Sequence, residues 1–115
     1  MKDSVVEEKS LAFAVRIVNL YKYLVQEKNE YVMSKQLLRS GTSIGANVAE
    51  GERGQTKADF NAKMNVALKE ANETDYWLKL LCRTEYINEE EFTSMTHDLK
   101  EIVAIWVAIC KKTNK

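Results

Sequence analysis

The fold of this chain is decided by a stretch in which glycines and small polar residues interrupt a helical pattern without ending it. The stretch reads Arg39-Ser40-Gly41-Thr42-Ser43-Ile44-Gly45-Ala46-Asn47-Val48-Ala49-Glu50-Gly51. At about 100° per residue, one side of this helix collects Leu37, Leu38, Gly41, Ile44, Gly45, Val48 and Ala49. Each glycine costs about 1 kcal/mol of helix propensity relative to alanine. Gly41 and Gly45 therefore predict either a close contact with another helix or a backbone surface left bare for a ligand.

The opposite side of the same helix carries a row of polar residues, namely Arg39, Ser43, Asn47 and Glu50. Consecutive members are three or four residues apart, so their side chains can touch along the helix. The row is either a polar network that fixes helix register or a subunit contact, or a recognition surface. In the second case Arg53 and Lys57 extend it across the next turn as phosphate contacts. Because arginine pairs well with both carboxylate and phosphate, residue type leaves both alternatives open.

The segments 31–40, 43–44 and 47–51 resemble the central motif of the four-helix-bundle proteins named after intervening sequences in 23S rRNA. Phe13 and Leu20, and later Glu70 and Glu73, also stand where that family places such residues. The resemblance implies a four-helix bundle and a ring-like homo-oligomer, a pentamer. The family is also similar to the accessory subunits of diversity-generating retroelements, which are basic pentameric bundles that bind nucleic acid and work with a reverse transcriptase.

Composition indicates one compact helical domain spanning residues 1–115. The chain has 45% hydrophobic residues, four glycines and no proline, which is typical of a folded helical protein. Lysine plus arginine and aspartate plus glutamate number 17 each, so the net charge is zero and gives no general attraction to nucleic acid or to anionic membranes. No segment has the length of apolar sequence that spans a membrane, and the start does not resemble a signal peptide. We therefore expect a cytoplasmic protein with no membrane partner.

Hydrophobic periodicity predicts four helices, at about residues 4–27, 34–50, 56–84 and 88–112. Residues suited to N-caps precede them or begin them: Ser4, Ser34, Thr56 and Asn88. Gly51 and Gly54 suit a C-cap and a chain reversal after the second helix. Strict 3–4 spacing gives the third helix the seam Phe60, Met64, Ala67, Ala71, Thr74, Leu78 and Leu81, and the fourth Phe92, Met95, Leu99, Ile102, Trp106 and Ile109. Short links between such helices predict an all-α, antiparallel up-down-up-down four-helix bundle.

The first helix has two apolar stripes. One contains Val6, Phe13, Ile17, Leu20 and Leu24, and the other contains Leu11, Ala14, Val18, Tyr21 and Val25. So widely apolar a helix in so small a protein predicts one partner inside the bundle and another outside it. We therefore expect this helix to form the oligomer, with Phe13 and Leu20 in the interface.

Motifs for catalysis and metal binding are missing from the sequence. A di-iron site in a four-helix bundle needs Glu-x-x-His on two helices, but the single histidine, His97, follows Ser94 at that spacing. Two cysteines are too few for a zinc site. Gly51–Gly54 lacks the lysine and the spacing of a phosphate-binding loop, and Ser43 has no histidine in its motif to activate it. We predict no catalytic residue, no metal and no cofactor, and so no enzyme.

The function predicted from the sequence is a non-enzymatic, self-associating scaffold or adaptor whose first partner is itself. The alternative is an accessory protein that binds structured RNA or DNA and partners a nucleic-acid enzyme such as a reverse transcriptase. Residues 31–69 favour this alternative locally, since they carry six basic and three acidic residues, whereas residues 70–101 carry three basic and nine acidic ones. The zero net charge of the whole chain departs from the basic retroelement subunits.

Overall fold

The computed structural model describes residues 4–113, which form four helices: α1 (Val5–Gln26), α2 (Met33–Glu52), α3 (Lys57–Arg83) and α4 (Glu89–Thr113). These residues contain no strand. Each predicted helix boundary lies within two residues of the observed one, so the predicted all-α fold of four helices is confirmed. No helix in this part of the chain combines the length and the apolar character that crossing a membrane requires.

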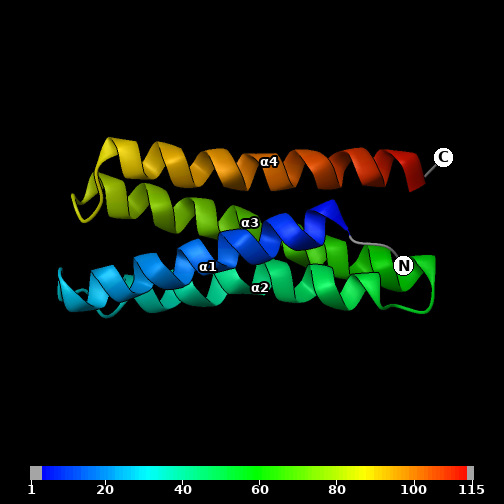
Figure 1. Cartoon of the computed structure of the whole chain (residues 1–115), viewed down its shortest axis with the longest axis horizontal. Coiled ribbons are helices and arrows are strands. Elements are labelled where there is room, and N and C mark those ends of the chain that lie inside the picture. Colours follow the sequence, from blue (N-terminus) through cyan, green and yellow to red (C-terminus); the bar gives the residue numbers. More distant parts are fainter. Residues whose placement is uncertain (1–3, 114–115) are drawn as a thin grey trace.

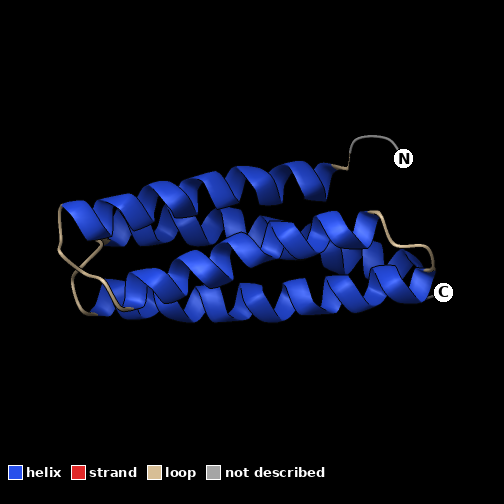
Figure 2. Ribbon diagram, turned by 90° about the horizontal axis from the view of Figure 1, so that it is seen from below, coloured by secondary structure: helices blue, strands red, loops and turns tan. Residues whose placement is uncertain are grey.

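The helices lie side by side along the 45 Å long axis of the molecule (Figure 1). The first and third connections lie at one end, and the second connection lies at the other end with the start of α1 and the end of α4 (Figure 1). Only these short connections interrupt the helices (Figure 2). Each helix packs against its neighbour in sequence, and α4 also packs against α1. The four helices therefore enclose a single core.

Large apolar side chains from all four helices fill this core. Those that are less than 2% exposed include Phe13, Ile17, Leu24, Leu37, Ile44, Met64, Leu78 and Leu81. The predicted seams of α3 and α4 are buried from Met64 to Leu81 and from Met95 to Trp106, and Phe60, Phe92 and Ile109 are half-buried at their ends. The 3–4 spacing of the sequence thus identified the inward sides of α3 and α4.

Gly41 and Gly45 face α1 at very short range. A Cβ atom at Gly41 would lie 2.7 Å from Cγ1 of Ile17, and one at Gly45 would lie 3.3 Å from the carbonyl oxygen of Ser10. The predicted close helix contact is confirmed, and α1 is the helix that makes it. Because α1 covers this side of α2, the glycine backbone is not open to a ligand.

Side-chain caps begin three of the helices as expected. The hydroxyl of Ser4 accepts from the backbone N–H of Glu7 at 3.2 Å. Thr56 with Asp59, and Asn88 with Glu91, each exchange two hydrogen bonds between side chain and backbone. These reciprocal bonds satisfy N–H groups that the first helical turn leaves without a partner.

The N-terminus of α2 is capped differently from the prediction. Ser34 lies inside the helix, where it is buried and its hydroxyl donates to the carbonyl oxygen of Glu30 at 2.8 Å. The Glu30 carboxylate instead accepts from the backbone N–H groups of Val32, Met33 and Ser34 at 3.1, 3.0 and 2.7 Å. A carboxylate at this position also complements the positive end of the helix dipole.

The end of α2 corrects a second expectation. Gly51 is not a left-handed C-cap, because α2 continues to Glu52 and no glycine among the described residues has a positive φ. Gly51 is buried instead, and a Cβ atom there would lie 3.2 Å from Cβ of Lys63 on α3. The residue is small because α3 passes close to it.

We predict that Gly41→Ala lowers the free energy of unfolding by about 1–3 kcal/mol, because the added methyl group overlaps three side-chain atoms of Ile17. In an Ile17→Ala background those atoms are absent, so the same substitution should stabilise the protein by up to about 1 kcal/mol through helix propensity. Denaturant unfolding of the wild type, Gly41→Ala, Ile17→Ala and the double variant measures both changes in free energy. Equal effects in the two backgrounds would contradict the assigned contact.

Candidate functional site on helices α2 and α3

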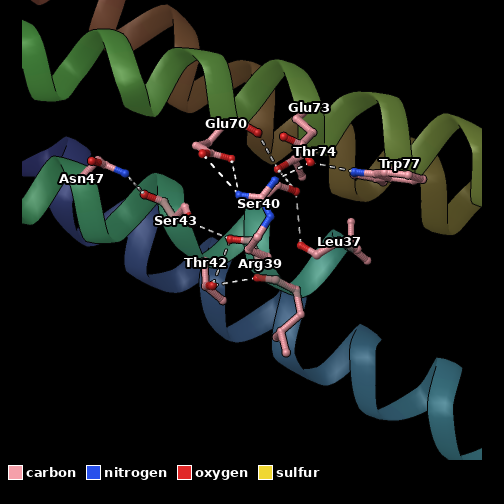
Figure 3. A network of polar contacts seen from close by, with 11 residues as sticks. Leu37, Arg39, Ser40, Thr42, Ser43, Asn47, Glu70, Glu73, Thr74 and Trp77 are labelled. Atoms are coloured by element: carbon pink, nitrogen blue, oxygen red, sulfur yellow. Dashed lines mark hydrogen bonds and ion pairs between the residues drawn. The ribbon is translucent and has the colours of Figure 1, made fainter. Parts of the chain in front are cut away.

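The predicted polar row lies on α2 beside the polar edge of α3, and its two ends form ion pairs across that boundary. Arg39 donates to Oε1 of Glu70 at 3.2 Å and forms a second, shorter hydrogen bond with Glu73 (Figure 3). At the other end, Glu50 pairs with Lys63 at 2.7 Å. We call these residues, with Ser43, Asn47 and Trp77, the α2–α3 polar surface.

The two middle members of the row bond to the backbone of their own helix. The Ser43 hydroxyl donates to the carbonyl oxygen of Arg39 at 2.6 Å, and the Asn47 amide donates to the carbonyl oxygen of Ser43 at 2.8 Å (Figure 3). Such bonds to the preceding turn are common for short polar side chains in helices. The expected bonds from side chain to side chain along the row are therefore replaced by bonds from side chain to backbone.

An aromatic pair on α3 adjoins the ion pair. Trp77 Nε1 donates to Oε2 of Glu73 at 3.1 Å, and the rings of Tyr76 and Trp77 are 5.1 Å apart at 75°. The hydrogen bond from Arg39, followed by that from Trp77, lowers the pKa of Glu73. The same bond to Glu73, together with the charge of Glu70, raises the pKa of Arg39. Both groups therefore remain charged at neutral pH.

A buried pair of hydroxyl groups lies behind the ion pair. Ser40 and Thr74 are both 0% exposed. The Thr74 hydroxyl oxygen is 2.9 Å from the Ser40 hydroxyl oxygen and 2.7 Å from the carbonyl oxygen of Glu70 (Figure 3). Because a buried polar group needs a partner, this pair favours one register of α2 against α3.

Arg53 and Lys57 lie far from Arg39. Fourteen residues of helix separate Arg53 from Arg39, which corresponds to about 21 Å. Arg53 donates to the carbonyl oxygen of Ala49 at 2.7 Å and lies 3.5 Å from a carboxylate oxygen of Glu7 on α1. Lys57 is exposed at the first residue of α3. The structure does not bring these two cations together with Arg39 into one basic cluster.

Periodicity within α2 does not reveal the α3 members of this surface, which are Lys63, Glu70, Glu73 and Trp77. The family resemblance marked Glu70 and Glu73, but it did not identify their partner. The described residues hold no group of three or more His, Cys, Asp or Glu side chains that could bind a metal. Within the surface, Arg39 instead pairs with two carboxylates, Glu70 and Glu73, and Lys63 pairs with Glu50, which makes it an electrostatic seam between two helices.

Phe13 and Leu20 do not lie on the outer surface of α1. Phe13 is 1% exposed and belongs to the core. Leu20 is half-buried between α1 and α4. The outward side of α1 consists of the other predicted stripe, in which Leu11 is 65% exposed, together with the neighbouring Val15, which is 54% exposed.

Two comparisons with known proteins agree with this fold. Residues 2–108 match the family described as 23S rRNA-intervening sequence protein. A crystal structure from Bacteroides thetaiotaomicron VPI-5482, described as a protein with unknown function from the S23 ribosomal protein family, is 63% identical in sequence. It superposes with a TM-score of 0.92 over 93% of this chain and 99% of its own length. No curated protein matches the chain. The family resemblance seen in the sequence is confirmed.

We predict that Glu73→Gln lowers the free energy of unfolding by about 0.5–1 kcal/mol at pH 7, as expected for a partly exposed ion pair. The pKa of Glu73 in the folded protein lies below its ordinary value of 4.5. Its contribution is therefore complete above that value and is lost as the pH falls through the folded pKa. In urea unfolding measured from pH 7 to pH 3, the free energies of unfolding of the wild type and of Glu73→Gln should become equal at the acid end.

Asp75→Asn is the matched control for this measurement, because among the described residues Asp75 pairs with Lys79 of its own helix, at 3.2 Å, and with no residue of another helix. Its effect at pH 7 should be smaller than that of Glu73→Gln. If the difference in free energy of unfolding between the wild type and Glu73→Gln stays constant with pH, the charge of Glu73 does not contribute to stability.

Proposed function

The chain belongs to the 23S rRNA-intervening sequence protein family, and from this premise we propose that it is a non-enzymatic, self-associating helical scaffold. One observation carries the proposal, namely the outward apolar side of α1. We call this side the outer α1 face and define it by Leu11, Val15 and Val18, flanked by Ala14 and Val25. Leu11 and Val15 are exposed, and the other three are half-buried.

Spacing supports association through this face. Leu11, Val15 and Val18 follow one another at intervals of four and three residues, which aligns them along one side of the helix. Burying a leucine or valine side chain fully stabilises a structure by about 1.5–3 kcal/mol. Contiguous exposed apolar residues of this kind mark interaction sites. We propose a second copy of the chain as the partner, in a ring of five as the family resemblance implies.

Nucleic-acid binding has less support, because carboxylates already pair with half of the basic residues in the segment 31–69. Arg39 pairs with Glu70 and Glu73, Lys63 with Glu50, and Arg53 with Glu7. Phosphate contacts dominate the affinity of proteins for nucleic acid and need an excess of lysine and arginine on one face. A partnership with a reverse transcriptase therefore stays the second proposal, after the scaffold.

We predict that Leu11→Asp converts the oligomer into a folded monomer, because it places a charge in an apolar interface. Light scattering coupled to size exclusion measures the mass, and circular dichroism checks that the helices remain. The control is Val66→Asp, which changes a 40% exposed valine on α3 and should leave the oligomer intact. Phe13→Asp should unfold the chain because Phe13 is in the core. A monomeric wild type, or an oligomer unaffected by Leu11→Asp, would disprove the assignment.

We also predict that the purified protein does not bind structured RNA, duplex DNA or single strands with a steep salt dependence. Fluorescence anisotropy across a salt series measures this. Micromolar binding that weakens steeply with salt would put the nucleic-acid function first. In that case Arg53→Gln with Lys57→Gln should reduce the slope of log K against log salt by about 2 if both residues contact phosphate.

A further inference from the structure

A groove separates the second half of α1 from the beginning of α4. Its volume is about 510 Å³. Met95, which is buried, and the half-buried Leu20 and Tyr23 give it an apolar floor. Glu90 and Glu91 from the first turn of α4 line its rim. The groove therefore combines an apolar surface with two carboxylates a short distance away.

The surroundings of the groove are acidic. Two further depressions adjoin it around the start of α4 and share residues with it, including Glu90 and Glu91. Together the three are lined by the acidic residues Glu85, Glu89, Glu90, Glu91 and Asp98, and by two basic residues, Arg16 and Lys28. The lining of these three depressions therefore carries an excess of negative charge.

Both basic residues are already engaged. Arg16 forms an ion pair with Asp98 at 2.6 Å and donates to the Ser94 hydroxyl at 2.8 Å. Lys28 Nζ lies 5.9 Å from the centre of the Tyr23 ring. Glu91 caps α4 through the backbone N–H of Asn88 at 2.8 Å but keeps a second carboxylate oxygen. Glu90 is exposed on the rim. The carboxylates of the rim thus have capacity for an added cation.

We propose that the α1–α4 groove binds a basic, partly apolar peptide segment of a partner protein. The aliphatic part of an arginine or lysine side chain would lie on Leu20 and Met95, and its charged head would reach Glu90 and Glu91. Long basic side chains bury their stems on apolar surface while the charge stays near water, which matches this floor and rim.

The inference deepens the proposed scaffold function, on which it rests, by giving the class of partner that the scaffold holds. Leu20, on the floor of the groove, and Val18, on the outer α1 face, are about 160° apart around α1. Nucleic acid and anionic lipid do not fit the groove, because its excess charge has the same sign as theirs.

A labelled peptide tests the proposal on the full-length protein. The probe is a fluorescein-labelled peptide in which arginines flank a leucine, compared with versions that carry glutamate for arginine or serine for leucine. We expect anisotropy to report micromolar binding of the first peptide only. We expect amide shifts in ¹⁵N–¹H spectra to be centred on Leu20, Tyr23, Glu90 and Glu91.

Variants separate the groove from general electrostatics. Glu90→Gln combined with Glu91→Gln should weaken binding about 10-fold or more, since charge-assisted hydrogen bonds are the strong ones, and glutamine at 91 still serves the capping box. Asn19→Trp, at an exposed position that lines the groove, should block it without changing the core. Glu8→Gln removes an exposed carboxylate from the first turn of α1, at the other end of the bundle, and should leave the affinity unchanged.

Several outcomes would overturn the proposal. One is the absence of binding up to about 1 mM peptide. Another is a loss of affinity in Glu8→Gln equal to that in the variant with Glu90→Gln and Glu91→Gln. A third is binding that Asn19→Trp leaves intact. Binding that appears only in the Leu11→Asp monomer would also do so, because a second copy would then occupy the groove. Light scattering of the same samples keeps the two proposals apart. An intact oligomer that binds no peptide refutes the groove alone, and a wild-type monomer that binds it refutes self-association alone.

Discussion

Contact between α1 and α2 at Gly41 and Gly45 is the constraint on which the rest of the structure depends. Without side chains at these positions, Ile17 and the backbone of Ser10 lie directly on the surface of α2. This contact fixes the rotation of α1 about its own axis. Phe13 and Ile17 then point into the core, and Leu11 and Val15 point outward. The apolar surface proposed for self-association is thus a consequence of two missing Cβ atoms.

The contacts at each boundary between helices are of a different type. α1 meets α2 through close apolar packing, and α2 meets α3 through a buried hydroxyl pair covered by ion pairs. α1 meets α4 partly through exposed charged pairs, Arg16 with Asp98 and Lys9 with Glu101. Exposed ion pairs contribute little to stability. The groove lies at this boundary between α1 and α4, where the partner proposed above would not disturb the tighter packing elsewhere.

Much of the candidate site could be predicted from the sequence, but its chemistry could not. Spacing alone placed Arg39, Ser43, Asn47 and Glu50 on one side of α2. It could not show that Arg39 would meet Glu70 and Glu73, because residues more than 30 positions apart come together only through helix packing. Because these carboxylates pair with Arg39, its guanidinium joins α2 to α3 and is already occupied, so it is a poor candidate for binding phosphate. Arg53 likewise has a partner that is distant in the chain, Glu7 on α1, besides the Ala49 carbonyl oxygen of its own helix.

The sequence by itself determined the number of helices, their boundaries and most of their caps, because helical periodicity and capping act over three or four residues. The tertiary structure decided which of the two apolar stripes of α1 faces the core. Both stripes satisfy the same periodicity, so the surface of α2 had to select between them. It also replaced Ser34 by Glu30 as the cap of α2, because the turn before the helix brings the Glu30 carboxylate back onto three free N–H groups. Local patterns specify elements, whereas the pairing of their surfaces depends on contacts between residues distant in the chain.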